Sequence, residues 1–325
     1  MSVTIKDIAK RADVAISTVS YVLNNKSGAI KASEETRRKI FRIASELNYS
    51  PSMMAKGLRE GKTYLAGVML GSISGSFVPE ILQGIEDVLH KNNYNMIISS
   101  HENPEDCMAR IDQLERKKID GLISFSGVGL EYAAGKNIPL VSLCRKSDID
   151  GTVSVYVDEG KMGRLAAEYI SGKGHRDIIV IDGRRPKCVD AFRKILAERN
   201  IFLTDKMLLK GFSFEDGREV MRIIKKKKLK ATAAFAYNDI LAAGMIYEAQ
   251  KQGIKIPEDI SILGIDDLPV CKMVNPNITT VAQPQYEQGA KAAEILLSGI
   301  NGTALEDTVL SPFIIERESF IRRIG

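Results

Sequence analysis

The sequence predicts an α/β core of two doubly wound parallel-sheet subdomains, preceded by an all-α headpiece at the N-terminus. Three observations lead to this prediction. The 325 residues exceed the size at which a single hydrophobic core keeps growing, so several domains are expected. From residue 64 onward, short apolar runs alternate with amphipathic stretches, as strands and helices do around a parallel sheet. Before residue 64 the apolar residues show helical spacing only.

The first two predicted helices form a helix-turn-helix. Thr4 and Asp7 have the spacing of a capping box, which starts a helix at Ile5. After a turn at Asp13, a second helix over residues 16–23 is expected to bury Val19, Val22 and Leu23. The side chains that it leaves pointing outward are Ile16, Ser17, Ser20 and Tyr21. Small polar residues at the start of such a second helix are typical of a motif that reads the major groove of DNA.

A third helix and a short fourth one complete the N-terminal part. Ser33 caps the third helix, and its expected buried stripe consists of Ile40, Ile43, Ala44 and Leu47. Pro51 then permits a new helix over residues 52–59, which ends before Gly61. We therefore expect a helix-turn-helix unit over residues 1–49 and a short helix with a linker over residues 50–62, which the family resemblance described below implies are a DNA-binding headpiece and a hinge helix.

The positive charge is concentrated in this N-terminal part. Residues 1–63 contain 12 lysines and arginines against 6 acidic residues, a net charge of +6. Because the whole chain carries +5, residues 64–325 sum to −1. Charge alone is also compatible with an ordinary solvated surface. Together with the helix pattern in the same residues, it favours a module that binds DNA phosphates.

The core is expected to span residues 63–325 and to contain two successive sets of strands and helices. In the first set, strands are predicted over residues 65–70, 96–98, 121–125 and 139–143, and helices over residues 79–91, 104–117 and, shorter, 130–136. In the second set, strands are predicted over residues 178–181, 232–236 and 260–265, and helices over residues 161–171, 188–199, 214–227 and 240–252. A last helix over residues 285–298 and apolar strands near 309–313 and 314–315 close the chain.

Composition excludes several classes of protein. No apolar run approaches the ~20 residues of a membrane span, and Lys6, Asp7 and Lys10 interrupt every candidate signal peptide, so a cytoplasmic protein is expected. The four cysteines are far apart and form no C-x-x-C pair, so neither a zinc site nor a disulfide framework is predicted. The three histidines have no metal-ligand spacing. We expect no metal, no cofactor and no catalytic residues.

The chain resembles the LacI–GalR family of bacterial transcription regulators over essentially its whole length. The motifs that carry the resemblance are TIKDIA at 4–9, STVS at 17–20, SEETR at 33–37, LNYSP at 47–51, VD at 157–158, GHR at 174–176, YND at 237–239, PEDIS at 257–261, GIDD at 264–267 and TTVAQP at 279–284. Each motif alone is weak, but ten in the family's order form a specific signal.

The resemblance implies a core shaped like a periplasmic sugar-binding protein, with an effector bound between its subdomains. The N-subdomain would comprise residues of about 63–155 plus 284–310, and the C-subdomain about 158–281 plus 311–325. The resemblance also implies a cytoplasmic homodimer that binds double-stranded, near-palindromic operator DNA and a small effector such as a sugar or sugar derivative. Because the sequence stops at Gly325 without a heptad tail, a dimer is expected rather than a tetramer.

By resemblance, one set of residues is expected to contact DNA. In the headpiece these are Thr4, Ile16, Ser17, Thr18, Ser20, Tyr21 and Asn24, and in the hinge Met54, Ala55, Lys56 and Leu58. Thr18, Ser20 and Asn24 suit phosphates, whereas Ile16, Ser17 and Tyr21 lie where base edges are read. Tyr21 stands where the family usually has Arg or His, and it could instead pack on the third helix. Leu58 matches a leucine that wedges into the minor groove, although such a stripe can also pack on its own core.

A second set of residues is expected to bind the effector, because each follows a predicted strand or matches a ligand position of the family. They are Ser72, Ser74, Phe77, Ser126, Arg145, Phe212, Asn238 and Asp266. Asn238 could merely cap the following helix, and Asp266 could be a turn residue. Cys188 and Cys144 replace an arginine and an aspartate that the family often has, and the segment 182–188 looks shortened. The pocket is therefore expected to be less polar than is typical.

The sequence supports one function over two rivals. We expect a ligand-responsive, sequence-specific DNA-binding transcriptional regulator that represses a carbohydrate-utilisation operon. The alternative is an enzyme acting on a sugar or nucleoside, fused to a DNA-binding domain, with Asp266 and Asp267 as a carboxylate pair. No nucleophile–base pair or phosphate loop supports that alternative. A pure sugar-binding protein is disfavoured by the headpiece.

Overall fold

The computed structural model describes residues 3–23, 32–49, 53–125, 127–183, 185–303 and 306–323, with backbone alone for residues 53–56. The chain divides into two compact units, residues 1–63 and 64–325. Asn24 and Ser126, two of the predicted site residues, lie outside the described residues.

The N-terminal unit is helical, as predicted. Its helices are α1 (Ile5–Ala12), α2 (Ile16–Leu23), α3 (Glu34–Glu46) and α4 (Met53–Glu60). Helices α1 to α3 enclose a small core whose fully buried side chains include Ile8, Val19 and Ile40. α1 begins where the capping-box spacing predicts, and the Ser33 hydroxyl caps α3 by accepting a hydrogen bond from the Thr36 N–H at 3.2 Å.

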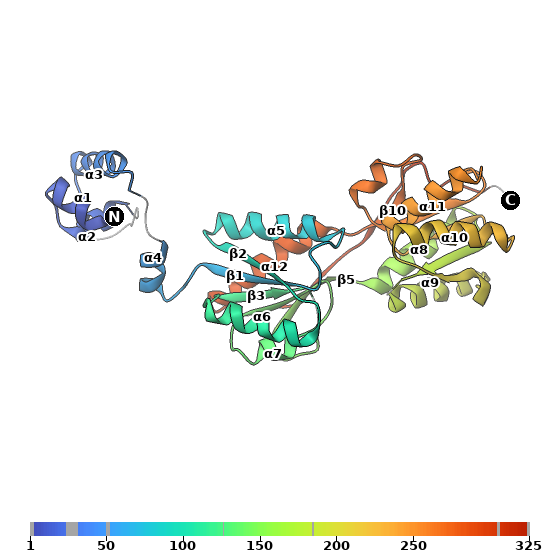
Figure 1. Ribbon diagram of the computed structural model, residues 1–325, viewed down its shortest axis with the longest axis horizontal. Helices are drawn as coiled ribbons and strands as arrows, with labels where there is room; N and C mark the ends of the chain where they lie inside the picture. The colour runs from blue at the N-terminus through green and yellow to red at the C-terminus, as the bar shows by residue number, and fades with distance from the viewer. Residues whose placement is uncertain are drawn as a thin grey trace. The chain divides into compact units, whose positions relative to one another are not determined.

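The first half of the core is a six-stranded sheet in the order β11-β5-β4-β3-β1-β2. Its strands are β1 (Leu65–Leu70), β2 (Asn95–Ser100), β3 (Gly121–Ser124), β4 (Leu140–Leu143), β5 (Thr152–Val157) and β11 (Thr308–Leu310), all parallel. Helices α5 (Val78–Lys91) and α12 (Gln285–Ile300) cover one face, and α6 (Pro104–Arg116) and α7 (Leu130–Ala134) cover the other (Figure 1).

The second half repeats this plan, with the order β12-β10-β9-β8-β6-β7. Its strands are β6 (Ile178–Asp182), β7 (Leu208–Lys210), β8 (Ala233–Phe235), β9 (Ser261–Asp266), β10 (Thr279–Ala282) and β12 (Phe313–Ile315), of which only β12 is antiparallel within this sheet. Helices α8 (Glu159–Gly172) and α9 (Pro186–Glu198) cover one face, and α10 (Phe214–Lys226) and α11 (Asp239–Lys251) the other (Figure 1). Two 3-10 turns, η1 (Asp205–Met207) and η2 (Pro269–Lys272), complete it.

The prediction of two doubly wound subdomains is confirmed. In each sheet the chain first builds outward on one side and then reverses, between β1 and β3 in the first sheet and between β6 and β8 in the second. Ligands of open α/β sheets bind beyond the carboxyl ends of the strands at this reversal. The segments that follow β1, β3, β6 and β8 are therefore the ones from which a ligand site is expected.

The chain passes between the two sheets three times. It leaves the first sheet after β5, returns to it after β10, and leaves it again between β11 and β12. Strands β5, β7 and β10 were not among the predicted strands. Of the two closing strands, the first is shorter than predicted and the second one residue longer, and Ser311 and Pro312 separate them. Short strands at a sheet edge or at a crossing have too few residues to show a clear period.

Helices α5 and α12 approach each other unusually closely. A Cβ atom on Gly84 would lie 2.1 Å from the Tyr286 carbonyl oxygen, and one on Gly289 would lie 2.0 Å from that of Ile81. Only glycine fits at this crossing. The contact matters because both helices begin beside the space between the subdomains, so it sets the positions of the side chains on their first turns.

Candidate functional sites

The first candidate site is the exposed start of α2. α1 and α2 are joined by a turn at Asp13, whose φ of 58° lies in the left-handed region that aspartate tolerates. Val19 and Val22 anchor α2 in the headpiece core, whereas Ile16 is 49% exposed and Ser17 is also exposed. An apolar side chain in water at the beginning of a second helix is available to contact a base, for example a thymine methyl group.

The other predicted contacts of α2 are half-buried. Thr18, Ser20 and Tyr21 all keep part of their surface accessible. The Tyr21 ring also packs partly against the headpiece core. Tyr21 therefore combines a packing contact with an accessible edge, and its role in reading bases stays a prediction.

Thr4 has a structural partner within its own turn. Its hydroxyl donates to Asp7 Oδ2 at 2.7 Å, and its N–H donates to the same oxygen at 2.9 Å. These hydrogen bonds hold the pKa of Asp7 below its usual value. The exposed Thr4 therefore helps to start α1, and a phosphate contact from it stays a prediction.

The predicted hinge helix is present as α4 (Met53–Glu60). Met54, Ala55 and Lys56 lie in its first half, where the side chains are outside the described residues. Leu58 is 89% exposed, the highest value among the large apolar side chains described. An eight-residue helix that exposes a leucine is marginally stable by itself, so α4 needs a further contact to bury that side chain.

The second candidate site is a cavity of about 480 Å³ between the two sheets of the core. Its apolar wall includes Leu70, Phe77, Ile81, Phe125, Cys144, Val157 and Met162. Its polar lining includes Ser72, Arg145, Glu159, Arg185, Tyr237, Gln283, Gln285 and Gln288. These residues come from the carboxyl ends of strands in both sheets and from the first turns of α5, α8 and α12, as the strand order leads one to expect. The cavity has the size of small-molecule sites.

The structure brings together three of the predicted effector residues. Ser72, Phe77 and Arg145 all line the cavity from the first sheet. Ser74 lies beside them, with its hydroxyl 2.8 Å from that of Ser72. One of the two hydroxyls donates to the other, which leaves the second hydroxyl's hydrogen free to donate elsewhere.

Phe212 and Asn238 lie apart from the lining of this cavity. The Asn238 side-chain oxygen accepts from the Leu241 N–H at 2.8 Å and caps α11, while its amide nitrogen donates to the Phe212 carbonyl at 2.9 Å. The ring of Phe212 is half exposed. Asn238 therefore has the capping role that its sequence position also allowed, and effector binding by this pair stays a prediction.

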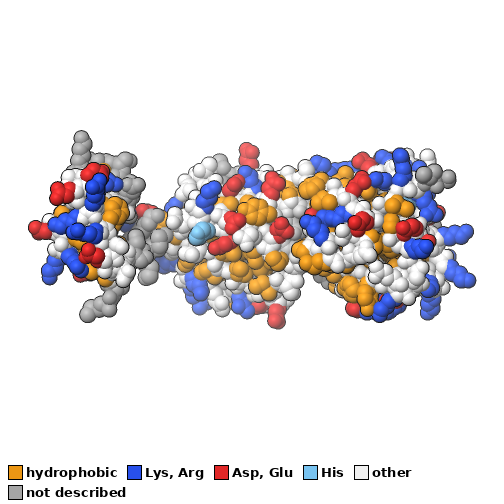
Figure 2. Space-filling view, turned by 90° about the horizontal axis from the view of Figure 1, so that it is seen from above, with side chains coloured by type: hydrophobic (Ala, Val, Ile, Leu, Met, Phe, Trp, Pro, Cys, Tyr) orange, Lys and Arg blue, Asp and Glu red, His pale blue; other side chains and the backbone are white. Residues whose placement is uncertain are grey.

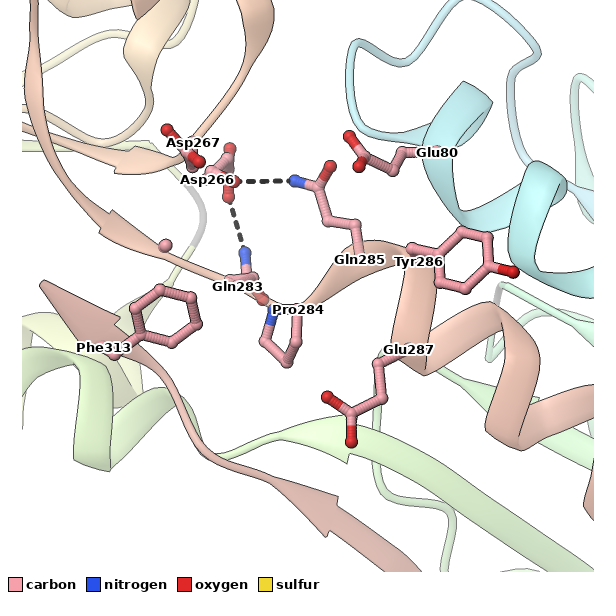
Figure 3. Close-up of a pocket in the computed structure, with 10 residues that line it drawn as sticks. Glu80, Asp266, Asp267, Gln283, Pro284, Gln285, Tyr286, Glu287 and Phe313 are labelled. Carbon is pink, nitrogen blue, oxygen red and sulfur yellow. Dashed lines mark hydrogen bonds between the residues drawn. The ribbon is translucent and has the colours of Figure 1, made fainter. Parts of the chain in front are cut away.

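Asp266 is only 3% exposed and sits at the centre of a hydrogen-bond network. Its Oδ1 accepts from Arg185 Nη2 at 2.9 Å and from Gln283 Nε2, and its carbonyl accepts from Gln285 Nε2 at 3.0 Å. Figure 3 shows both glutamines reaching Asp266 from the segment that returns to the first sheet. Asp266 lines a second cavity of about 280 Å³ at this crossing, together with Glu80, Glu287 and Phe313.

A buried carboxylate behind β9 supports this arrangement. Asp239 is fully buried, accepting from the Thr280 hydroxyl at 2.7 Å and from the Leu268 N–H at 2.8 Å. Burial raises its pKa to about 7. Through these two hydrogen bonds Asp239, on α11, holds β10 and the segment after β9 together. They fix the backbone next to the crossing that carries Gln283.

Arg185 is one of several residues of the cavity lining that the sequence did not reveal. It precedes α9 in the segment 182–188, and its guanidinium carbon lies 5.3 Å from the centre of the Tyr237 ring. The ion pair with Asp266 favours its charged form and raises its pKa, although burial acts against this. The family often has an arginine at the position of Cys188. In this chain the arginine that reaches the cavity is Arg185, three residues earlier in the sequence.

The two cysteines at the cavity are unreactive by their surroundings. Burial raises the pKa of Cys144, which lines the cavity, and of its neighbour Cys188 to about 12 in each case. A thiol in that range is neutral at pH 7 and a poor nucleophile. Of the two, Cys144 alone lines the cavity, so the expectation of a less polar pocket stays a prediction.

The two acids named in the enzyme alternative, Asp266 and Asp267, are both ion-paired. The carboxylate of Asp266 is bound by Arg185 and that of Asp267 by Arg317, so each acid is neutralised by its own arginine. Among the described residues, no group of three or more histidine, cysteine or acidic side chains could hold a metal ion. No helix in the described ranges is long and apolar enough to cross a membrane.

Two family models match the chain. The model described as bacterial regulatory proteins, lacI family, matches residues 4–52, and the model described as periplasmic binding protein-like domain matches residues 154–320. The first match covers the helix-turn-helix, and the second covers more than half of the chain.

Three curated relatives match over nearly the full length. The chain is 33% identical to the HTH-type transcriptional repressor PurR of Erwinia tasmaniensis, covering 97% of this chain and 96% of the relative. It is 32% identical to the ribose operon repressor of Haemophilus influenzae, covering 97% and 98%. It is 30% identical to the catabolite control protein A of Priestia megaterium, covering 95% and 96%.

Two solved structures share the fold. The lac repressor dimer bound to operator and the anti-inducer ONPF matches with a TM-score of 0.84 at 23% identity, covering 99% of this chain and 100% of that one. A LacI family regulator from Enterococcus faecium with bound ribose matches with a TM-score of 0.71 at 26% identity, covering 80% and 100%.

Proposed function

The chain belongs to the lacI family of bacterial regulatory proteins, and we propose that it is a homodimeric, ligand-responsive repressor acting in the cytoplasm on a carbohydrate-utilisation operon. One observation supports this function above all others. A single chain carries a helix-turn-helix with an exposed second helix and, in a separate unit, a cavity between two subdomains. A DNA reader and a small-molecule site on one chain suit a regulator whose DNA affinity depends on a ligand.

We propose that residues 1–62 bind operator DNA. Lysine and arginine side chains are prominent on the visible face of the headpiece (Figure 2), in keeping with the net charge of +6 over residues 1–63. Ile16, Ser17 and Tyr21 would face base edges, and Thr4, Thr18, Ser20 and Asn24 would contact phosphates. The structurally related lac repressor was solved as a dimer on its operator, which supports two headpieces on a near-palindromic site.

The exposed Leu58 supports a role for α4 in the same complex. Two α4 helices, one from each protomer, would bury Leu58 against each other and in the minor groove, with Met54 and Ala55 on the same face and Lys56 beside the phosphates. Because α4 is short, it would be ordered only when the two hinges are close together. The core could therefore control the stability of α4 by setting the distance between the two hinges.

The cavity would supply that control. Its lining residues come from both subdomains, so a ligand that contacts both would favour a closed arrangement of the core. The crossings after β5 and β10 connect directly to this lining through Val157, Gln283 and Gln285. Closure would move the first subdomain, from which the chain continues back into α4. The ribose-bound relative and the ribose operon repressor support a sugar or sugar derivative as effector.

A binding assay with the full-length protein tests this function. Duplexes selected from random DNA should share a near-palindromic site, and affinity for that site should fall steeply as salt rises, because phosphate contacts release counterions. A small molecule that binds the cavity should change this affinity. A protein that selects no common sequence, or that binds all DNA equally, would refute the proposal.

A further inference from the structure

The cavity contains a polar side chain that the fold leaves without a partner. Gln288 of α12 lines the cavity and is only 2% exposed. Within the part of the chain that the structure describes, no residue makes a hydrogen bond to its side-chain amide. The atoms of this amide are not sealed off from solvent, so they reach the space of the cavity. Gln288 is therefore available to a ligand at the apolar end of the cavity, beside Val78 and Ile81.

A second group with unused hydrogen-bonding capacity is Arg185. Its side chain is 14% exposed, and a guanidinium group has five N–H donors. Among the described residues, the partners of these donors are the Asp266 carboxylate and the weakly accepting sulfur of Met162, 3.7 Å from Nη1. Asp266 does not line this cavity, so the arginine and not the carboxylate faces the ligand.

A third group lies on the opposite side of the cavity. Arg145 follows β4 of the first sheet and is exposed, and no described residue forms an ion pair or hydrogen bond with its guanidinium. Glu159 is the acidic residue among the described lining, and it forms no ion pair with either arginine. The cavity lining therefore offers two guanidinium groups, one from each subdomain: Arg145, which has no ion-pair partner among the described residues, and Arg185, whose charge is balanced by Asp266 but whose remaining N–H donors are unused.

We propose that the effector is a small organic oxyanion, a carboxylate or a phosphate ester, whose acid group lies between Arg145 and Arg185 and whose uncharged end reaches Gln288. This inference rests on the proposed function, since it names the ligand class of the same cavity. Guanidinium groups bind carboxylates and phosphates through paired, charge-assisted hydrogen bonds. Because the two arginines belong to different subdomains, one anion between them would also draw the subdomains together.

The first test uses inorganic phosphate on the full-length protein. Phosphate should raise the melting temperature of the wild type above that in sodium chloride of the same ionic strength. Arg145→Gln should weaken phosphate binding about tenfold, because it removes one guanidinium group without leaving a buried partner unpaired. Arg193→Gln, which removes an exposed arginine of α9 away from the cavity lining, is the matched control and should behave as the wild type does. Phosphate and chloride acting alike on the wild type would overturn the proposal, as would full phosphate binding by Arg145→Gln.

The second test asks whether the acid group of the ligand is a carboxylate or a phosphate ester, and it uses three related six-carbon compounds. Isothermal titration with glucose, gluconate and glucose 6-phosphate compares a neutral sugar, a carboxylate and a phosphate ester. The proposal predicts that an acid binds more tightly than glucose, and that the stronger of the two acids identifies the class. Glucose binding as tightly as both acids would contradict it. Operator binding by the ligand-free wild type keeps the two proposals apart: a wild type that binds no operator would reject the proposed function, whereas operator binding without a preference for either acid would reject the anion site alone.

Discussion

The headpiece and the core present their functional side chains in opposite ways. In the headpiece, the candidate contacts lie on the surface, and Leu58 and Ile16 expose apolar groups to water. In the core, the candidate contacts line a cavity between two sheets, where Gln288 and Arg185 are nearly buried although Arg145 stays exposed. Exposed residues that contact a large partner take little part in the packing of their helix. Residues that line an internal cavity also pack against the rest of the core. Mutations should therefore separate function from stability in the headpiece and combine them in the core.

Removing the headpiece should have the largest effect. A fragment of residues 64–325 should lose specific DNA binding by about 10³-fold or more, since the helix-turn-helix and the positive charge are gone. It should still unfold cooperatively, because the hydrophobic clusters of both subdomains lie within it. A gel-shift titration decides this prediction. A fragment that still retards operator DNA would show that the core, and not the headpiece, carries the DNA-binding surface.

Within the core, Asp266→Ala should destabilise the fold by about 3–5 kcal/mol, because it leaves Arg185 without its charged partner in a mostly buried place. Asp266→Asn keeps an acceptor for Arg185 and should cost less. Urea unfolding of both variants measures the difference. A wild-type stability for Asp266→Ala would show that the ion pair contributes nothing to the core.

In the headpiece, Tyr21→Ala should relax specificity at one symmetric base-pair position by about 1–3 kcal/mol. Lys56→Ala should instead weaken binding to every sequence and lower the salt slope by about 1, as expected for a phosphate contact. Binding-site selection with each variant distinguishes the two effects. An unchanged sequence preference in Tyr21→Ala would mean that its packing against the headpiece core is its whole role.

Gln288→Leu should change the stability of the core by no more than about 0.5 kcal/mol, since the amide makes no hydrogen bond to a described residue and reaches the open cavity. The same change should weaken ligand binding. This combination is expected for a group kept for function and not for folding. Chemical denaturation in the absence of ligand provides the measurement, and a destabilised variant would contradict the view of Gln288 as unpartnered.

The smallest effect should appear in the pH dependence of core stability. His175 is buried between the Thr232 hydroxyl and the Ile321 carbonyl, each 3.0 Å from a ring nitrogen, and burial lowers its pKa below 6.5. The unfolded chain therefore binds the proton more readily, so stability should fall as the pH drops below about 6.5 through the lowered folded value. His175→Gln should remove this part of the pH dependence. An unchanged unfolding curve between pH 7 and pH 5 for both proteins would exclude the effect.

The sequence predicted the headpiece better than the ligand site, and the two regions show why. The helix-turn-helix is built from local signals, such as the Thr4–Asp7 cap and the stripe of Val19 and Val22. The two-sheet core was also predictable, because buried strands and amphipathic helices alternate. Strands β5, β7 and β10 were not predicted, since β7 and β10 are short and β5 lies at a crossing.

The cavity lining depends on long-range packing, which sequence spacing does not show. Arg185 reaches the cavity from the segment 182–188, whose length differs from the family pattern. The arginine position of the family, counted back from Phe192, therefore fell on Cys188 and not on Arg185. Gln288 looked like an ordinary polar position of an amphipathic helix, because glutamine is usually exposed. Its burial follows from the close approach of α5 and α12 at Gly84 and Gly289, which only the three-dimensional structure reveals.

The central claim is that the core cavity and the hinge are two ends of one coupling, and operator titrations of Leu58→Ala and Asp266→Asn test it most directly. Each variant would be titrated with its selected operator, with and without a ligand bound by the wild-type cavity. Leu58→Ala should lose operator affinity and DNA bending while binding ligand normally in the absence of DNA. Asp266→Asn should bind operator normally without ligand but lose most of its response, because the ion pair that positions Arg185 at the cavity is lost. Such a response is typically about 1–3 kcal/mol. A Leu58→Ala protein with full operator affinity and no ligand response, or an Asp266→Asn protein with a full response, would contradict the account.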